Sequence, residues 1–170
     1  MYITDLMPAL KEPTMIALLI RSLLCLVCAG VIGYDRNVHG AAAGMRTHIL
    51  VCVGAMIAMS TGQFAFLQYD SGDLTRIGAQ VVSGIGFLGA GSIIVTRNNT
   101  IAGLTTAAGL WASACIGLAL GVGFYEGALI GTVAVFFTER ILRNLSKSIR
   151  DKHNRRDNDD IHKIPDSSDR

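Results

Sequence analysis

Three glycines of this sequence have the spacing that dinucleotide-binding proteins use to approach a pyrophosphate. They are Gly84, Gly86 and Gly89, in the pattern Gly-x-Gly-x-x-Gly. In those proteins the pattern joins a strand to a helix, and a carboxylate about 20 residues later binds the ribose. No Asp or Glu occurs here between Asp73 and Glu126, so the sugar would find no carboxylate. The pattern alone therefore does not predict a nucleotide site.

A second candidate for chemistry is the pair Cys25-x-x-Cys28. A zinc site would need a second pair of ligands, and a redox pair would need a soluble helix terminus that lowers the thiol pKa. The other two cysteines, Cys52 and Cys115, stand alone in apolar stretches. We interpret all four as small apolar residues of a core, and we predict no metal site.

Groups that could form a catalytic centre do not come together in the sequence. His39 and His48 could titrate near neutral pH, but two histidines without a carboxylate pair make a weak metal site. The sequence has no pattern typical of a hydrolase triad, a phosphate-binding loop or paired acid–base carboxylates. We therefore predict no enzyme activity and no cofactor.

The composition indicates a membrane protein. Of the 170 residues 51% are apolar and 16% are charged, whereas a soluble domain has about 25% charged residues. More than half of the charged residues lie from Glu139 onward, and the apolar stretches before it are long enough to cross a bilayer. A bilayer-spanning helix takes about 20 apolar residues. We predict an integral membrane protein with a lipid bilayer as its surroundings.

Five apolar stretches predict the fold, an all-α compact bundle of about five transmembrane helices. The first stretch is too long and wrongly flanked for a cleaved signal peptide, and its Arg21 would extend to the outer interface. We divide the chain into a short outer N-terminus (1–14), a transmembrane domain (15–145) and a charged tail (146–170) that should be disordered. The expected spans are 15–33, 46–66, 77–95, 104–121 and 125–142.

Basic residues near the ends of these spans predict the orientation. The loops 34–45 and 96–103 share a side with the tail, and this side carries most of the Arg and Lys residues. We therefore predict an outer N-terminus and a cytoplasmic C-terminus in the plasma membrane. The basic residues of the tail should contact anionic lipid rather than nucleic acid.

Small residues at helical spacing are expected to hold the bundle together, because lipid gives helices little hydrophobic reason to associate. Such residues recur in every apolar stretch after the first. A leucine at Gly86 or Gly117 should therefore force neighbouring backbones apart. The predicted packing positions are Gly84, Gly86, Gly89 and Gly91 in the third stretch and Gly109, Ser113, Gly117 and Gly121 in the fourth.

Polar residues inside or beside the spans are costly in lipid and form the candidate site. Asp35 and Arg46 could pair between the first two spans and bind an ion or a partner, or could serve orientation and capping alone. Asp73 is placed to cap the third helix, and Gln80 should point into the bundle. The full set is Asp35, Arg36, Arg46, Thr47, Asp73, Arg76, Gln80, Thr105, Thr106 and Trp111. For the last four, interhelical hydrogen bonding is the simpler account and substrate contact is the alternative.

Four blocks of this sequence form an ordered pattern. The longest is DLTRIGAQVVSGIGFLGAGSII, from Asp73 to Ile94. The other three blocks are IGYDR (32–36), AAGMRTHILVCVGA (42–55) and IAGLTTAAGLW (101–111). Together, in this order, they resemble the MgtC/SapB family of bacterial membrane proteins. Asp35 replaces the family's usual Glu, and Leu74 stands where many members have Pro.

The resemblance implies a plasma-membrane protein of about five spans that helps cells to adapt to low magnesium, acid or a host. It also implies regulation by contact with other membrane complexes, including the F-type ATP synthase, rather than direct magnesium transport. Longer members carry a cytoplasmic globular domain, which the short polar tail cannot form. We therefore expect a membrane-only form of the family.

The sequence leaves two functions open. The first is a non-enzymatic regulator that contacts another membrane protein or a second copy of itself. The alternative is a carrier or channel for Mg²⁺ or another small solute, with Asp35, Arg46 and Gln80 lining its path. Two arginines near the cytoplasmic mouth argue against a Mg²⁺ path on charge grounds.

Overall fold

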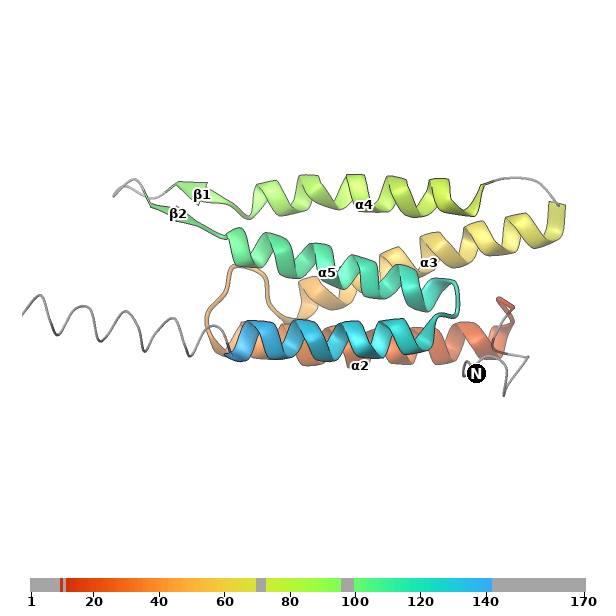
Figure 1. Ribbon diagram of the computed structural model, residues 1–170, viewed down its shortest axis with the longest axis horizontal. Coiled ribbons are helices and arrows are strands. Elements are labelled where there is room, and N and C mark those ends of the chain that lie inside the picture. Colours follow the sequence, from red (N-terminus) through yellow and green to blue (C-terminus); the bar gives the residue numbers. More distant parts are fainter. Residues whose placement is uncertain (1–9, 11, 70–72, 96–99, 142–170) are drawn as a thin grey trace, which may run out of the picture. The chain divides into compact units, whose positions relative to one another are not determined.

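The computed structural model describes Leu10 and residues 12–69, 73–95 and 100–141. The helices are α2 (Met15–Val38), α3 (Met45–Tyr69), α4 (Leu74–Gly91), α5 (Leu104–Gly121) and a last helix over 125–141 (Figure 1). Between α4 and α5, β1 (Ile94–Val95) pairs with β2 (Ile101–Ala102) in antiparallel fashion. The expected tail and most of the outer N-terminus lie outside the described residues.

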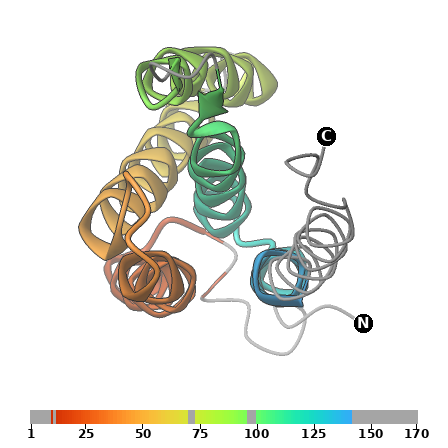
Figure 2. The same ribbon diagram turned by 90° about the vertical axis from the view of Figure 1, so that its left-hand side faces the viewer.

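The helices α2 to α5 and residues 125–136 of the last helix belong to one compact unit, Met1–Phe136. The second unit is Phe137–Arg170, and its described residues 137–141 are helical. Within the first unit α5 packs against α2, α3 and α4, and α3 packs against α2 and α4. Figure 2 shows that α4 and α2 lie on opposite sides of α5. The main core therefore forms where α2, α3 and α5 meet, and it includes Cys25, Cys28, Ile32, Cys52, Met56, Ile116 and Leu120.

Local sequence explains where the helices begin. Thr14 caps α2, because its hydroxyl oxygen accepts a hydrogen bond from the Ala17 backbone N–H at 3.2 Å. Before α5 the chain turns at Gly103, whose φ of +95° is one that residues with side chains rarely adopt. A side chain at Gly103 would also collide with the Ser92 carbonyl oxygen, so glycine is needed where the hairpin meets α5.

The expected all-α bundle of five helices is confirmed, with the short strand pair as an addition. α4 ends at Gly91, whereas the third stretch was expected to continue to Val95. Ile94 and Val95 pair with β2 instead, because β-branched residues fit an extended backbone well. α2 continues past the expected position 33 to Val38, and α5 has the bounds expected for the fourth stretch.

Three helices of the described chain are long and apolar enough to cross a membrane, namely α2, α3 and α5. α4 is not among them, because its 18 residues include Arg76, Gln80 and several glycines. The structure thus supports three candidate spans within a bundle of five helices.

The small-residue ladder of α5 lies in the core. Gly109, Ser113, Gly117 and Gly121 are all buried. A methyl group on Gly117 would collide with the backbone carbonyl of Cys52 in α3. On Gly121 it would lie 2.6 Å from Cβ of Met59. The backbones of α5 and α3 therefore approach so closely that no side chain fits between them at these positions.

The glycines of α4 are placed differently. Gly89 is buried, and a methyl group there would lie 3.5 Å from Cβ of Ala107. Gly84, Gly86 and Gly91 are exposed, and a methyl group on any of them would meet nothing within 4 Å. Within the described chain these three glycines do not make the packing that their spacing predicted.

Leucine substitutions separate the two sets of glycines. Gly117→Leu should lower the free energy of unfolding by about 3 kcal/mol or more, because the new side chain must push α5 away from α3. Gly86→Leu should leave the stability close to that of the wild type. Thermal unfolding of both variants in one detergent is the measurement. Equal destabilisation by the two substitutions would contradict this packing.

Candidate functional site

Arg21 lies inside the bundle, near the beginning of α2, and its side chain is fully buried (0% exposed). The expectation that it extends to the outer interface is wrong. Its guanidinium group donates hydrogen bonds to side chains of α3 and of the last helix, and to two backbone carbonyls. We call this set the Arg21 network, and it consists of Arg21, Ser60, Gln63, Tyr125 and the carbonyl oxygens of Leu10 and Gly121.

The distances in the Arg21 network show how four segments are joined. Arg21 Nη1 donates to Gln63 Oε1 at 2.9 Å, to Ser60 Oγ at 3.3 Å and to the Gly121 carbonyl at 2.6 Å. Nε donates to the Tyr125 hydroxyl at 3.4 Å, and Nη2 to the Leu10 carbonyl at 3.1 Å. A single side chain of α2 thus contacts α3, the end of α5, the last helix and the segment before α2.

The carbonyl of Gly121 explains why a cation is favourable at this point. It is the last residue of α5, and the last carbonyls of a helix have no partner inside the helix. Here the oxygen accepts from Arg21 and also from the Ser60 hydroxyl, at 3.1 Å. Positive charge is stabilising at a helix C-terminus, where the helix dipole is negative. Arg21 therefore satisfies the Gly121 carbonyl at the end of α5, in addition to joining the helices.

A second buried polar group lies at the other end of α2. Arg36 Nη2 donates to Thr106 Oγ1 at 3.2 Å. His48 Nδ1 and Ser113 Oγ are 2.9 Å apart, a hydrogen bond whose direction depends on the histidine tautomer. Thr106 and Ser113 lie two turns apart on the same face of α5. Arg36 of α2 contacts this face at Thr106, and His48 of α3 contacts it at Ser113. We call these four residues the Arg36–His48 cluster.

The close approach of α2 and α3 holds the Arg36–His48 cluster in place. A methyl group on Gly33 would lie 2.5 Å from Cα of Met45 and 3.2 Å from Cβ of His48. The imidazole of His48 is fully buried, and among the described residues its Nε2 has no hydrogen-bond partner. His48 therefore sits in the core with one of its two nitrogens satisfied.

The predicted site residues do not all meet. Asp35 and Arg36 are buried at the end of α2. The backbone oxygen of Asp35 accepts a hydrogen bond from His39 Nδ1 at 2.7 Å. Arg46 and Thr47 are exposed in the first turn of α3. The pairing of Asp35 with Arg46 stays a prediction.

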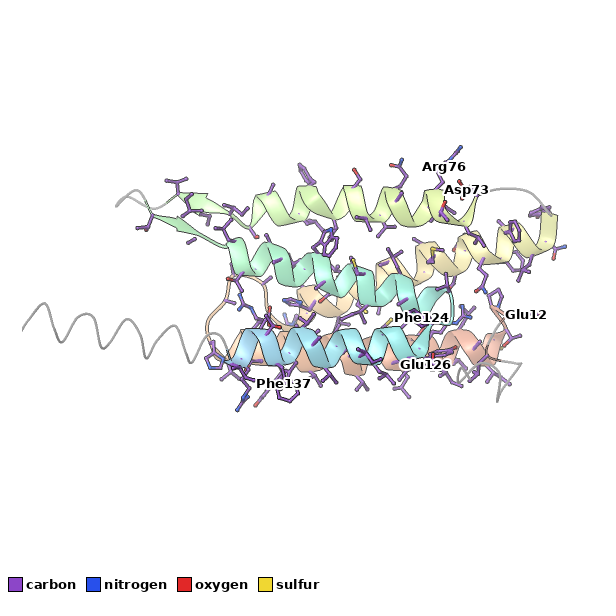
Figure 3. All side chains as sticks on the ribbon, in the orientation of Figure 1. Glu12, Asp73, Arg76, Phe124, Glu126 and Phe137 are labelled. Atoms are coloured by element: carbon purple, nitrogen blue, oxygen red, sulfur yellow. The ribbon has the colours of Figure 1, made fainter. Side chains whose placement is uncertain are left out.

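In α5, Thr106 is buried and bonded to Arg36, whereas Thr105 is exposed and Trp111 is 48% exposed. Gln80 is exposed on α4, so the expectation that it points into the bundle is wrong for the single chain. Asp73 and Arg76 lie at the first turn of α4, and Figure 3 shows Arg76 pointing away from the other helices. The structure thus brings Arg36 and Thr106 together and leaves the α4 residues outside.

The cap expected at Asp73 is confirmed. Its Oδ1 accepts from the Thr75 hydroxyl at 2.6 Å and from the Thr75 backbone N–H at 2.9 Å. These hydrogen bonds lower the pKa of Asp73 below its usual range, because they favour the ionised carboxyl. The first turn of α4 therefore depends on a carboxylate at the surface.

The sequence-based reasoning missed Ser60, Gln63, Tyr125 and His48 as members of buried networks. A signal for two of them exists, because Ser60 and Gln63 are three residues apart and share a face of an apolar helix. An arginine inside the preceding span also indicates that polar acceptors lie on a neighbouring helix. Among the described residues, no three His, Cys, Asp or Glu side chains are arranged to hold a metal ion.

Removing the guanidinium group tests the Arg21 network. Arg21→Met should lower the free energy of unfolding by about 3 kcal/mol, because several buried acceptors lose their donor at once. Arg21→Lys should restore the stability only in part, because an ammonium group has three donors and lacks the planar geometry of the guanidinium group. Arg46→Met is the matched control, since Arg46 is exposed, and should change little. Equal melting temperatures for Arg21→Met and Arg46→Met in detergent would refute the network's importance.

The Asp73 cap predicts that the stability of the first turn of α4 depends on pH. Because the pKa of Asp73 is lowered in the fold, its contribution is present above the carboxyl's ordinary pKa and is lost as pH falls through the lowered value. Hydrogen exchange in the first turn of α4 should therefore accelerate at acid pH in the wild type. Asp73→Asn should cap α4 without this pH dependence. The same acid response in Asp73→Asn would assign it to another group.

Comparison with known proteins adds the family. The family model described as "MgtC family" matches residues 23–148. Relatives include "Putative magnesium transporter YhiD" of Escherichia coli K12 (39% identical over 140 residues, 79% of this chain and 65% of that protein). "Protein MgtC" of Brucella abortus strain 2308 is 43% identical over 118 residues, which are 68% of this chain and 47% of that protein.

A Haemophilus influenzae protein of unassigned function is 36% identical over 158 residues, 89% of this chain and 66% of that protein. No solved structure matched the chain. The chain thus spans between about half and two thirds of the length of these relatives. The matched residues include the whole Arg36–His48 cluster and every member of the Arg21 network except Leu10 and Arg21. Together with the relatives it places the chain in the MgtC family of membrane proteins.

Proposed function

We propose that this protein is a non-enzymatic regulator of the plasma membrane that acts by contact with another membrane protein. The adaptation it serves would be that implied by the family resemblance, namely to low magnesium, acid or a host environment. The observation that carries the proposal is a face of α4 that the rest of the described chain leaves uncovered.

This uncovered face consists of small residues at helical spacing. Ala79, Ser83, Gly86 and Ala90 are all exposed, at positions i, i+4, i+7 and i+11. Residues at these intervals lie on one side of a helix, and small side chains allow the backbone of another helix to approach closely. Gln80, also exposed, would find hydrogen-bond partners in a protein neighbour that lipid tails do not offer. We call this surface the α4 face.

The topology that places the α4 face in lipid is part of the proposal. All five helices would cross the membrane, with the N-terminus outside and the C-terminus in the cytoplasm. Arg76 and Asp73, at the first turn of α4, would then lie at the outer interface, where a charged first turn can reach water and headgroups. Arg76 is exposed and points away from the bundle (Figure 3), as this arrangement needs.

The proposed partner is a membrane complex with a helix that fits the α4 face. The family resemblance makes the F-type ATP synthase the first candidate, and a second copy of this chain is the other. A regulator of this kind needs a stable bundle that presents one face, and the two buried polar networks support such a bundle.

Recovery of the partner from mild detergent tests this function. Affinity capture of the wild-type protein followed by mass spectrometry should yield a membrane protein in stoichiometric amount. Gly86→Leu should reduce its recovery about tenfold, which corresponds to about 1.4 kcal/mol of contact energy, because the leucine blocks close approach. Gly54→Leu is the matched control, since Gly54 is an exposed glycine of α3 with nothing within 4 Å of an added methyl group.

Either of two results would defeat the proposal. One is repeated recovery of the protein alone under conditions that keep known membrane complexes intact. The other is an equal loss of the partner in the Gly86→Leu and Gly54→Leu variants, which would show that the α4 face has no special role.

The alternative function is a carrier or channel for Mg²⁺ or another small solute, and the name of the Escherichia coli relative, "Putative magnesium transporter YhiD", favours it. Buried Arg21 and Arg36 oppose a cation path through the bundle, because positive side chains repel Mg²⁺. Proteoliposomes should therefore show no more Mg²⁺ flux than empty vesicles. Flux above that level that changes in an Arg46→Ala variant would establish transport and replace the regulator hypothesis.

A further inference from the structure

A groove of about 380 Å³ lies between the beginning of α2 and the second half of α3. Pro13, Leu18 and Ser22 form one wall, and the opposite wall includes Ile57 and Phe64. A mostly apolar concave site with a few hydroxyls is typical of a binding site for a small apolar ligand. The groove is separate from the α4 face and plays no part in the function proposed above.

The groove is continuous with the surface that meets lipid. Both helices that form it are candidate membrane spans. The residues at its rim remain partly exposed, with Leu18 at 36%, Ile57 at 54% and Phe64 at 53%. Neighbouring apolar side chains of α2 that point outward, such as Leu19 (63%), extend the same surface. This step rests on the membrane topology proposed above: with α2 and α3 across the bilayer, its hydrocarbon chains have direct access to the groove.

The groove is shorter than one leaflet. It begins at Pro13, just before the cap Thr14, and extends along α2 to Ser22. The helical part of this wall, from Met15 to Ser22, rises by about 10 Å, and the wall on α3, from Met56 to Phe64, rises by about 12 Å. Half of the hydrocarbon thickness is about 15 Å. An acyl chain that enters at the membrane interface would thus lie in the groove over about two thirds of its leaflet.

The inner wall of the groove borders the Arg21 network. Ser60 and Met56 line it, and the Ser60 hydroxyl accepts from Arg21 and donates to the Gly121 carbonyl. Hydrogen bonds of a buried polar network are strongest where water is excluded. An apolar occupant of the groove would keep water away from this side of the network.

We propose that this groove binds one acyl chain of a membrane phospholipid, from the leaflet in which α2 begins. The ester end of the lipid lies at the mouth, near Pro13, and the methyl end points toward Ser22. The bound chain packs against Ile57 and Phe64 and covers the Ser60 side of the Arg21 network. The lipid is held more tightly than the lipids that merely surround the bundle.

Photochemical labelling in vesicles tests this site. The probe is a phosphatidylethanolamine with a diazirine near the middle of one acyl chain, present in trace amount in vesicles of phosphatidylethanolamine and phosphatidylglycerol. After irradiation, peptide mapping should find labelling at Leu18, Ile57 and Phe64 about tenfold above that at Leu50. Leu50 is a suitable reference because it lies on α3, outside the groove, and is 71% exposed.

Two variants decide whether the groove itself is responsible. Ile57→Trp fills it and should reduce labelling of Leu18 and Phe64 to the level of Leu50. Leu50→Trp places the same ring on the same helix outside the groove and should leave the labelling unchanged. Melting temperatures in detergent show whether both variants are folded, and Thr61→Phe, which also narrows the groove, replaces Ile57→Trp if that variant unfolds.

The outcomes are distinct. Labelling that depends on the groove in this way supports the proposal. Equal labelling of all exposed apolar residues means surrounding lipid only and overturns it. Labelling that appears only after removal of residues 1–9 would mean that the chain's own N-terminal residues occupy the groove, which also overturns it.

Discussion

The structure depends on direct contact between the backbones of α5 and α3. At Gly117 no side chain fits between α5 and the Cys52 carbonyl, and at Gly121 the distance to Met59 leaves no room for one. In lipid, where apolar burial gives little net gain, such close approach is what makes dispersion contacts and interhelical hydrogen bonds strong enough to hold helices together. The approach also places the Gly121 carbonyl within reach of Arg21, at 2.6 Å. One buried cation can then join α2, α3 and the end of α5.

Two polar groups therefore stabilise the bundle from within, one at each end of α2. The Arg21 network satisfies the end of α5, and the Arg36–His48 cluster uses Thr106 and Ser113 on the same helix. Both groups use their polar atoms to contact neighbouring helices, and each contains a buried arginine. This arrangement favours a rigid scaffold over a path for cations. The α4 face, by contrast, has small side chains and open space beside Gly86, which suits contact with another helix.

Much of the fold could be predicted from the sequence, and particular residues show why the rest could not. The apolar stretches and the ordered blocks gave the all-α bundle and the family, and the ladder of α5 was recognised by its spacing. In α4 small residues occur on more than one side, so spacing could not reveal that Gly89 faces the bundle while Gly84 and Gly86 face away. Gln80 was expected in the interior because an amide is costly in lipid, and this cost does not show which side of α4 faces the bundle. Arg21 was expected at the interface because a long basic side chain near the end of a span can extend there. Its acceptors come from segments that are about 40 and 100 residues away in sequence, and no local pattern connects them.

We propose that α4 presents one face to a protein partner, and a photo-crosslinking scan in intact membranes would detect this contact. A photoreactive amino acid would be placed, one position at a time, from Ala79 to Ala90, and the products identified by mass and by peptide mapping. Protein adducts should recur with helical periodicity and be strongest at Ala79, Ser83, Gly86 and Ala90, whereas the positions between them should give lipid adducts or none. Lipid adducts alone at all four positions would contradict it.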